Sequence, residues 1–429
     1  MSVTVHVPIE YEFLNEIKKI TGELGLAIDQ LKGSKSLKVV GKKKDIRKFM
    51  KKMELEHKEV SIFNSRDNKG KIKNYMVPKK EKSENLGQQN NNYTPVQIAE
   101  IYGFPKTTKT EERVNIAIIE LGGGYKVSDL EEYWRYLGLS IKPNVIPISV
   151  DGATNSPGSP ADGEVVLDIE VIGGIVPNSN IYVYFAPNNN QGFYDAVHAA
   201  IYDTEHNPSV ISISWGMPEN HWTKSEMIAF SSLIQKATEK GINVCVASGD
   251  NGATDGEFHL FFDKYHVDFP ASSPYSLACG GTTLLCPNCK YSDNGTSELV
   301  WGTTYYFSSE GGGGGYSSVF DKPSYQVLSK KTKRGVPDVC GVADPNTGWI
   351  IYLNEQYQVI GGTSAVAPMW AAYLSLLGVK SFITPKLYSC ETGFHDIIKG
   401  DNHGYHAGKG WDTASGLGSP NGTVLNSML

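Results

Sequence analysis

The sequence has no run of apolar residues approaching the roughly 18–20 that a membrane-spanning helix requires. We therefore expect no membrane partner. The first ten residues, Met-Ser-Val-Thr-Val-His-Val-Pro-Ile-Glu, have neither a basic start nor an apolar centre, so no secretory signal is visible.

Cysteine is also scarce. Six cysteines in 429 residues are too few for a disulfide scaffold. Cys286-Pro-Asn-Cys289 has the spacing of half a zinc site, but no second Cys or His pair of matching spacing lies nearby. We interpret this segment as a turn that an oxidising environment could close with a disulfide.

The net charge of −6 is unevenly distributed along the chain. Residues 1–80 carry 19 Lys and Arg against 10 Asp and Glu, a net +9, whereas the remainder has a net −15. A basic segment joined to an acidic body predicts that each binds the other. A nucleic-acid-binding arm would need a clustered basic stripe with aromatics to stack bases, whereas the lysines of residues 1–80 are spread through amphipathic, foldable sequence, so no nucleic-acid partner is expected.

Two units are expected. The first, residues 1–80, has strand-like segments at 3–7, 27–31, 36–40 and 59–64 and helix-like segments at 11–24 and 43–56. The order βαββαβ is typical of a compact α+β, ferredoxin-like fold. Residues 81–92 are polar and lack apolar periodicity, which predicts an accessible, cleavable linker.

The second unit, residues 93–429, has an α/β pattern. Apolar strand-like segments at 115–120, 180–185, 209–215 and 242–248 alternate with helix-like segments at 163–174, 192–202 and 224–240. This alternation predicts a parallel, doubly wound sheet. Ligands of such sheets gather at the carboxyl ends of the strands, where Glu120, Trp215 and Asp250 stand.

Residues 361–369, Gly-Gly-Thr-Ser-Ala-Val-Ala-Pro-Met, place Ser364 in a turn of small residues before an apolar, helix-like run. Small neighbours let a substrate backbone approach, and the start of a helix offers unpaired N–H groups, so the turn suits a nucleophile. An isolated Gly-Thr-Ser-Ala turn is equally typical of a tight entry into a buried helix.

Three acidic residues are further candidates for a catalytic site. Glu164 and Asp168 are four residues apart on an otherwise apolar helical segment, so their carboxyl groups would share one face. If buried, the two groups would share a proton; the alternative is a solvated acidic face. Asp250 follows a strand in Ser-Gly-Asp, where an Asp commonly forms a turn or caps a helix, but a protonated carboxyl there could donate to an oxyanion.

Together, Glu164-x-x-x-Asp168, Ser-Gly-Asp250 and Gly-Gly-Thr-Ser364-Ala, in this order and spacing, resemble the sedolisins, the serine-carboxyl peptidases, and most closely the kumamolisin subgroup. The resemblance covers residues 93–429 and includes the stretches 118–125, 212–216, 266–271 and 334–338. It implies a subtilisin-like fold and an acid-active endopeptidase made as a zymogen. Residues 1–80 would be a prodomain that inhibits the same chain. Protein or peptide substrates, a monomer and secretion are further expectations.

The resemblance also assigns roles to individual residues. Ser364 would be the nucleophile, Glu164 its general base, Asp168 the group that orients Glu164, and Asp250 the oxyanion donor. Glu120 and Trp215 would extend the hydrogen-bond network, and Asp268 would shape a specificity pocket that favours basic side chains.

A second implied site is for one Ca²⁺ ion near the end of the chain. Its ligands would be the side chains of Asp396 and Asp412 and the carbonyls of Ile397, Gly408 and Gly410. Calcium prefers such oxygen ligands, although loop aspartates beside glycine are, without the resemblance, more typical of turns.

The carboxyl chemistry itself points to acid. A histidine base loses its function below a pKa of about 6.5, whereas a carboxylate base works to about pH 4. None of the ten histidines has the His-Gly-Thr-like setting of an ordinary subtilisin. The alternatives are a tripeptidyl-peptidase of the same family and a catalytically silent relative that binds peptides.

Overall fold

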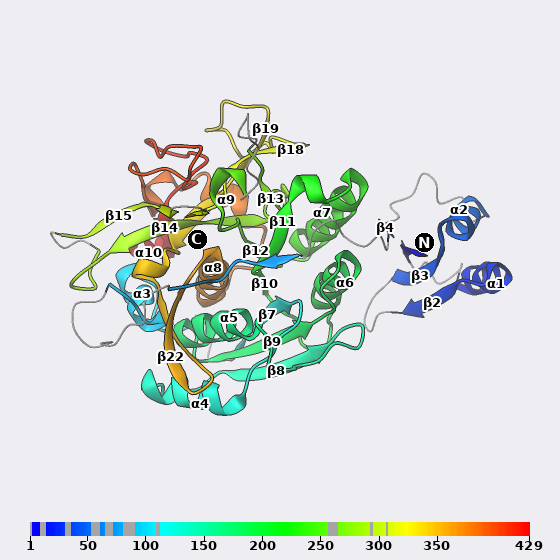
Figure 1. Cartoon of the computed structure of the whole chain (residues 1–429), viewed down its shortest axis with the longest axis horizontal. Helices are drawn as coiled ribbons and strands as arrows, with labels where there is room; N and C mark the ends of the chain where they lie inside the picture. Colours follow the sequence, from blue (N-terminus) through cyan, green and yellow to red (C-terminus); the bar gives the residue numbers. More distant parts are fainter. Residues whose placement is uncertain are drawn as a thin grey trace.

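The computed structural model describes residues 2–8, 14–30, 36–52, 61–64, 72–79, 91–108, 112–255, 265–291, 295–305 and 308–429. These residues form a small N-terminal unit beside a larger body (Figure 1). Residues 81–90 of the predicted linker lie outside the described residues, as do parts of the predicted segments 11–24, 27–31, 43–56 and 59–64.

The N-terminal unit has the predicted βαββαβ order. It contains β1 (Ser2–Pro8), α1 (Leu14–Leu24), β2 (Ala27–Gln30), β3 (Ser36–Lys42), α2 (Lys43–Lys52) and β4 (Ser61–Asn64). The strands form an antiparallel sheet in the order β2-β3-β1-β4. Apolar residues of the two helices, including Ile17, Ile46 and Phe49, bury against Val39 and Leu37 of the sheet. This packing gives the unit a core of its own.

The body is built on an eight-stranded sheet in the order β15-β14-β12-β10-β7-β9-β8, with β20 beside β14. All of its neighbouring strands are parallel except β14 and β15. The strands are β7 (Val114–Glu120), β8 (Asn144–Ser149), β9 (Ser179–Phe185), β10 (Val210–Ile213), β12 (Asn243–Ala247), β14 (Leu277–Leu285), β15 (Ser297–Val300) and β20 (Val339–Val342). The predicted doubly wound sheet is confirmed.

Helices cover both faces of this sheet, and β7 shows why. Ile116 and Ile118 belong to one apolar cluster with residues of α5 and α8, whereas Ala117 and Ile119 belong to another with residues of α6 and α7. Alternate side chains of a strand point to opposite faces, so a strand apolar at every position must be covered on both. The helices are α3 (Pro95–Ile101), α4 (Val127–Tyr136), α5 (Asp162–Ile175), α6 (Asn190–Ile201), α7 (Lys224–Glu239), α8 (Val366–Leu376), α9 (Thr384–Leu387) and α10 (Gly422–Met428).

The strand order reverses between β7 and β10. From β7 the chain runs outward to β8, returns to β9, and then crosses to β10 and onward to β12 and β14. The carboxyl ends of β7 and β10 therefore flank the point at which such sheets bind ligands. Glu120 ends β7, and Ser214 and Trp215 follow β10.

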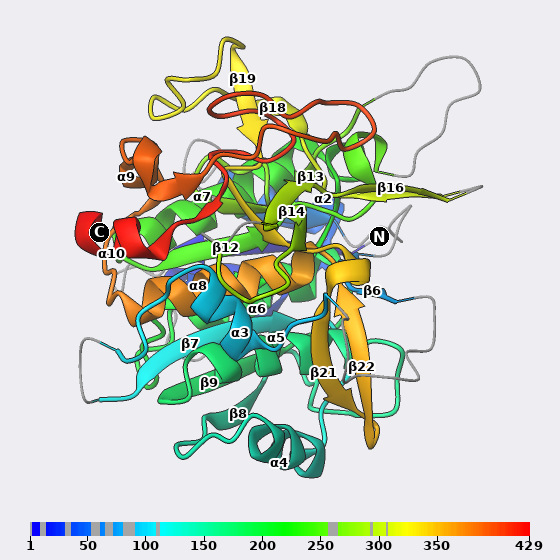
Figure 2. The same cartoon turned by 90° about the vertical axis from the view of Figure 1, so that its left-hand side faces the viewer.

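Two short-stranded structures line this edge. The predicted strand 209–215 is split, because after Ile213 the chain leaves the sheet and forms β11 (Trp215–Pro218), which pairs with β13 (Asp268–Phe269) and with β5 (Lys73–Asn74). On the other side, the hairpin of β21 (Trp349–Leu353) and β22 (Gln356–Gly361) pairs with β6 (Val77–Pro78), as Figure 2 shows.

The remaining pairs are peripheral. They are β16 (Gly302–Tyr305) with β17 (Ser308–Gly311), β18 (Gly315–Asp321) with β19 (Lys333–Val336), and β23 (Phe394–His395) with β24 (Ser419–Pro420). Across the described ranges, every helix is too short or too polar to cross a membrane.

Candidate active site

The acidic pair is buried. Every residue of α5 is buried, and Glu164 and Asp168 are both 0% exposed, which excludes the solvated acidic face. The Ser214 hydroxyl donates to both carboxyl oxygens of Asp168 at 2.9 Å. Burial raises the pKa of both carboxyls well above the ordinary range, and the charge of Asp168 raises the pKa of Glu164 further.

Glu120 and Trp215 join this cluster from the ends of the strands. The indole Nε1 of Trp215 donates to Glu120 Oε2 at 3.0 Å. Burial, and then the neighbouring Asp168, raise the pKa of Glu120 well above its ordinary value. Three carboxyl groups that influence one another in a buried place titrate as a set and share protons.

Ser364 lies in a single 3-10 turn, Thr363–Ala365, that leads into α8. Its hydroxyl is 3.5 Å from the Ser214 carbonyl oxygen, a long contact. The same hydroxyl is close enough to lower the pKa of Glu164, although neither Glu164 oxygen has a well-formed hydrogen bond within the described chain. Ser364 and Glu164 are therefore neighbours whose hydrogen bond is not fully formed, as is common in catalytic sites that hold no substrate.

Asp250 stands just beyond β12 and faces the serine turn. Its Oδ1 accepts hydrogen bonds from the backbone N and the hydroxyl of Thr363, both at 2.7 Å. Its Oδ2 is buried and has no partner among the described residues. Burial raises the pKa of Asp250 to about 8, so this carboxyl holds a proton at acid pH and Oδ2 is the atom left to carry it.

Part of the chain itself crosses the site. Tyr75 N donates to the Ser214 carbonyl at 3.2 Å, and Ser364 N donates to the Tyr75 carbonyl at 3.1 Å. Residues before Tyr75 pair with β11, and residues after it pair with β22. Gly362 has a φ of +108° and leaves room for this chain, because a Cβ there would lie 2.0 Å from the Tyr75 carbonyl oxygen.

Three of these residues were not predicted as site residues. Ser214 lies within the stretch 212–216, Thr363 lies beside Ser364, and Tyr75 falls inside the predicted prodomain. The short apolar run Tyr-Met-Val at 75–77, which follows a polar stretch, is the only sequence feature that marks the crossing segment. The side-chain types of this segment alone could not predict that it passes beside Ser364.

The predicted calcium residues come together in the C-terminal loops. Gly410 N donates to the Asp396 carboxylate at 3.0 Å, Gly408 N donates to Asp412 Oδ2 at 2.8 Å, and Ser415 Oγ contacts the Ile397 carbonyl at 3.4 Å. Their oxygen donors suit calcium by chemistry. In the described residues, no group of three or more His, Cys, Asp or Glu side chains is placed to hold a metal.

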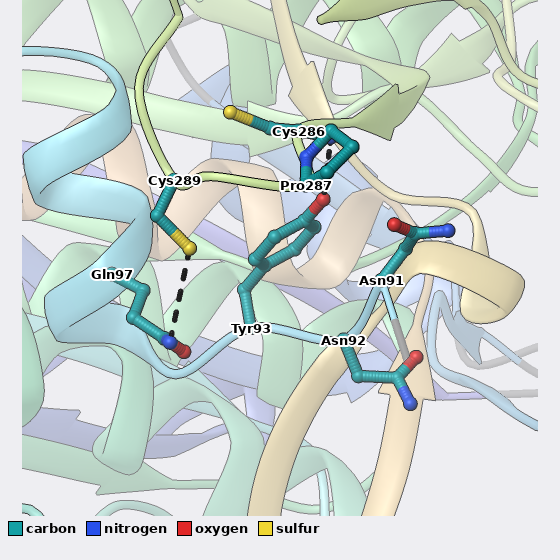
Figure 3. Close-up of a pocket in the computed structure, with 7 residues that line it drawn as sticks. All are labelled: Asn91, Asn92, Tyr93, Gln97, Cys286, Pro287 and Cys289. Carbon is teal, nitrogen blue, oxygen red and sulfur yellow. Dashed lines mark hydrogen bonds between the residues drawn. The ribbon is translucent and has the colours of Figure 1, made fainter. Parts of the chain in front are cut away.

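Cys286 and Cys289 form the predicted turn, in which Cys289 N donates to the Cys286 carbonyl at 3.0 Å. Both cysteines are free thiols. They line a pocket of about 490 Å³ together with Asn91, Asn92, Tyr93, Gln97 and Pro287 (Figure 3). The pocket is separate from the carboxyl cluster.

Comparison with known proteins assigns the chain to a family. A family model described as the subtilase family matches residues 150–381, which is more than half of the chain. The chain therefore belongs to the subtilase family.

Within that class, the similar proteins are sedolisins. Kumamolisin of Bacillus sp. (strain MN-32) is 44% identical over 361 residues, and sedolisin of Pseudomonas sp. (strain 101) is 29% identical over 363 residues. Each match covers 79% of this chain, but only 63% of kumamolisin and 61% of sedolisin. A solved Pseudomonas sedolisin, a serine-carboxyl proteinase complexed with pseudo-iodotyrostatin, has a TM-score of 0.70 and 28% identity, and the match covers 79% of this chain and 98% of that one. Within the subtilase family, the chain is thus similar to sedolisins.

The chain is also similar to more distant peptidases. Human tripeptidyl-peptidase 1 is 27% identical over 345 residues, which cover 70% of this chain and 57% of that protein. A Staphylococcus aureus epidermin leader peptide processing serine protease has a TM-score of 0.54 at 15% identity, with coverage of 100% and 99%. At that identity the likeness supports the fold alone.

Proposed function

We propose that the chain is an acid-active serine-carboxyl endopeptidase made as a zymogen. One observation carries the proposal: Ser364 lies beside the buried carboxyl of Glu164, and the adjacent Thr363 contacts Asp250, which has a second buried oxygen without a partner in the described chain. Buried carboxyl groups of raised pKa that converge on a serine are typical of acid and base catalysts.

In this mechanism Glu164 is the ionised member of the proton-sharing set of carboxyls, and it takes the proton of the Ser364 hydroxyl while the serine oxygen attacks a substrate carbonyl. Asp168, held by Ser214, orients Glu164 and disfavours a second negative charge beside it. Protonated Asp250 and the Ser364 N–H donate to the developing oxyanion. Glu164 then returns the proton to the leaving amine. Water repeats the sequence on the acyl-enzyme.

An endopeptidase is favoured over a tripeptidyl-peptidase by the crossing segment. Ile72 is the fourth residue back from the carbonyl at Ser364, and it is buried in the apolar cluster beside β11. The site therefore accommodates at least four residues before that carbonyl, whereas removal of tripeptides requires a site that is closed after three. The same contacts favour an active peptidase over a silent peptide-binding relative, because the carbonyl is placed against the nucleophile.

The zymogen proposal takes residues 1–80 as the prodomain and intramolecular inhibitor, 81–92 as a cleavable linker and 93–429 as the peptidase. The crossing segment supports this assignment, because residues 72–79 fill the groove that a substrate would need. Protein or peptide substrates, a monomeric state and secretion follow from the family.

The first test is Ser364→Ala. We expect hydrolysis of a denatured protein at pH 4 to fall to background, because no other group supplies the nucleophile, and we expect the chain to stay full length. Mass spectrometry of both the substrate and the enzyme measures the outcome. Persisting hydrolysis by the purified variant would remove Ser364 from the mechanism.

We also propose one Ca²⁺ ion at Asp396, Asp412 and the carbonyls of Ile397, Gly408 and Gly410. These residues converge from two loops, and all offer oxygen. A ligand that binds only the folded state at a hundred times its Kd adds about 2.7 kcal/mol of stability. Removing calcium from the Ser364→Ala chain with a chelator should therefore lower its Tm. Asp396→Asn should lower the Tm in calcium and abolish the effect of the chelator. A Tm that is indifferent to calcium would exclude the site.

A further inference from the structure

Residues 72–79 cross the site in the manner of a substrate. Tyr75 is held at both of its backbone polar groups, by the Ser214 carbonyl at 3.2 Å and by Ser364 N at 3.1 Å. Upstream, Lys73 and Asn74 lie antiparallel to Gly216 and Trp215; downstream, Lys79 N donates to the Val359 carbonyl at 3.0 Å. An extended segment paired on both sides of the nucleophile presents the bond between Tyr75 and Met76 to Ser364.

The Tyr75 carbonyl also meets the second oxyanion donor. A Cβ on Gly362 would lie 2.0 Å from the Tyr75 oxygen and 2.6 Å from Asp250 Oδ2, so both oxygens border the same small space. Asp250 Oδ2 has no partner in the described chain. The carbonyl therefore lies between a backbone N–H and a carboxyl oxygen that can donate, which is the arrangement that stabilises negative charge on that oxygen.

The Tyr75 side chain is buried beside Asp268, and we take the space that it occupies as the specificity pocket. The ring is 2% exposed, and its hydroxyl lies 2.6 Å from the place where a Cβ of Gly216 would stand. The Tyr75 hydroxyl and Asp268 Oδ1 are both buried, and neither has a well-formed hydrogen bond within the described ranges. Burial first, and then Asp268 and Asp255, raise the pKa of this hydroxyl, so the three groups are neighbours.

The pocket is better suited to a phenol than to a cation at acid pH. Burial, and then Asp255, raise the pKa of Asp268 well above its ordinary value, so Asp268 holds a proton where the enzyme is expected to work. A neutral carboxyl can accept a hydrogen bond from a tyrosine hydroxyl, whereas a buried arginine or lysine would need a negative charge opposite it. The resemblance to the family had predicted a preference for basic side chains at Asp268.

We propose that the chain first processes itself at the Tyr75–Met76 bond, and that the Asp268 pocket makes it a peptidase selective for tyrosine before the scissile bond. The inference rests on the proposed peptidase function and adds its first cleavage site and its substrate class. It moves the first cut upstream of the predicted linker 81–92.

The step balances as ordinary acyl transfer. The Ser364 oxygen bonds to the Tyr75 carbonyl carbon, and its proton passes to Glu164. The bond between the Tyr75 carbon and the Met76 nitrogen breaks, and Met76 takes that proton as a free amine. Water then adds to the ester of residues 1–75, losing a proton to Glu164, and the Ser364 oxygen leaves and recovers it. The products are residues 1–75 and a chain that begins at Met76.

The first experiment follows the full-length chain after a shift from pH 7.5 to pH 4, with intact-mass spectrometry of quenched samples. We expect the earliest new species to be residues 1–75 and 76–429 in wild type, and neither in Ser364→Ala. Tyr75→Ala should slow this cut at least tenfold. The matched control Tyr136→Phe alters an exposed tyrosine outside the groove and should process at the wild-type rate.

The second experiment adds peptides with the sequence of residues 71–80 to the processed enzyme. With Tyr, Phe or Arg at the position of Tyr75, we expect kcat/KM to fall in that order, with at least a tenfold loss for Arg. Asp268→Ala should reduce the preference for Tyr over Phe while the Phe peptide is still cut, a split that general damage to the site would not produce.

The outcomes separate the inference from the function on which it rests. Two results would overturn the inference without contradicting the proposed peptidase function. One is Ser364-dependent processing that begins within residues 81–92, and the other is faster cleavage of the Arg peptide than of the Tyr peptide. Absence of any Ser364-dependent hydrolysis, of the chain or of an added denatured protein, would overturn both.

Discussion

At the scale of the residue, the site is governed by the cost of burying charge. Glu120, Glu164 and Asp168 are each 0% exposed, and Asp250 is 5% exposed. Desolvation disfavours the ionised carboxylates, so Asp250 holds a proton, and Glu120, Glu164 and Asp168 share protons among themselves. A histidine base is protonated at acid pH and cannot accept a proton, whereas carboxyl groups can still exchange protons at that pH.

Asp250 should make the folded protein less stable as the pH rises. Its folded-state pKa of about 8 exceeds the ordinary value of 3.8, so the folded state binds the proton more tightly than the unfolded chain. The stabilisation is therefore fully present below about pH 4 and is lost as the pH rises through 8. Its full size is on the order of 5 kcal/mol, at 1.36 kcal/mol for each pKa unit.

Denaturant unfolding of Ser364→Ala at pH 4, 6 and 8 measures this dependence without autolysis. Asn at position 250 cannot titrate, so Ser364→Ala with Asp250→Asn should lose less stability between pH 4 and pH 8. An equal slope for the two proteins would show that Asp250 is not the group whose proton is held.

Single residues also show where sequence reasoning stops. Glu164 and Asp168 are readable because their spacing in a helix is fixed, and Asp250 and Ser364 because each follows an apolar element. Ser214, which donates to Asp168 from the end of a different strand, carries no local pattern. Tyr75 lies 289 positions before the serine that binds its carbonyl, and no periodicity reports so distant a contact.

At the scale of the element, periodicity predicted the buried framework well. β7, β9, β12, α5, α6 and α7 begin and end within a few residues of the predicted segments, because strands covered on both faces are apolar throughout and the helices between them carry apolar residues toward the sheet. The sequence pattern predicts β10 and the start of β11 as one strand. The chain turns out of the sheet at Ser214 and then pairs with β13 and β5, and no apolar pattern marks that turn. Two-residue strands such as β5 and β6 are too short for any pattern.

At the scale of the whole molecule, the charge split of the sequence has a structural counterpart. Lys38 of β3 donates to both Asp151 oxygens, at 2.9 and 3.0 Å, and also contacts Asp195 of α6. The side chain of Asp195 is 0% exposed and that of Lys38 is 11% exposed. Attraction between the +9 segment and the −15 body is thus partly concentrated in one buried cluster.

This concentration makes a prediction about salt. Exposed charges are screened over about 10 Å at 0.1 M salt, but buried pairs are screened much less. Removing one partner of a buried pair typically costs about 3–5 kcal/mol, because the other charge is left uncompensated. In the uncut Ser364→Ala chain at pH 7, Lys38→Met should therefore loosen the N-terminal unit strongly, whereas raising NaCl from 0.05 to 1 M should loosen it little.

Hydrogen exchange of peptides from β3 and α6 measures this docking directly, since their amides exchange faster when the two elements separate. The matched control is Lys52→Met, which removes an ion pair with Glu23 inside the N-terminal unit; those side chains are 48% and 46% exposed. We expect faster exchange in β3 and α6 for Lys38→Met alone. Equal effects of the two substitutions, together with faster exchange in high salt, would mean that diffuse surface charge holds the unit. The cluster at Asp195 would then be incidental to keeping residues 72–79 in the groove.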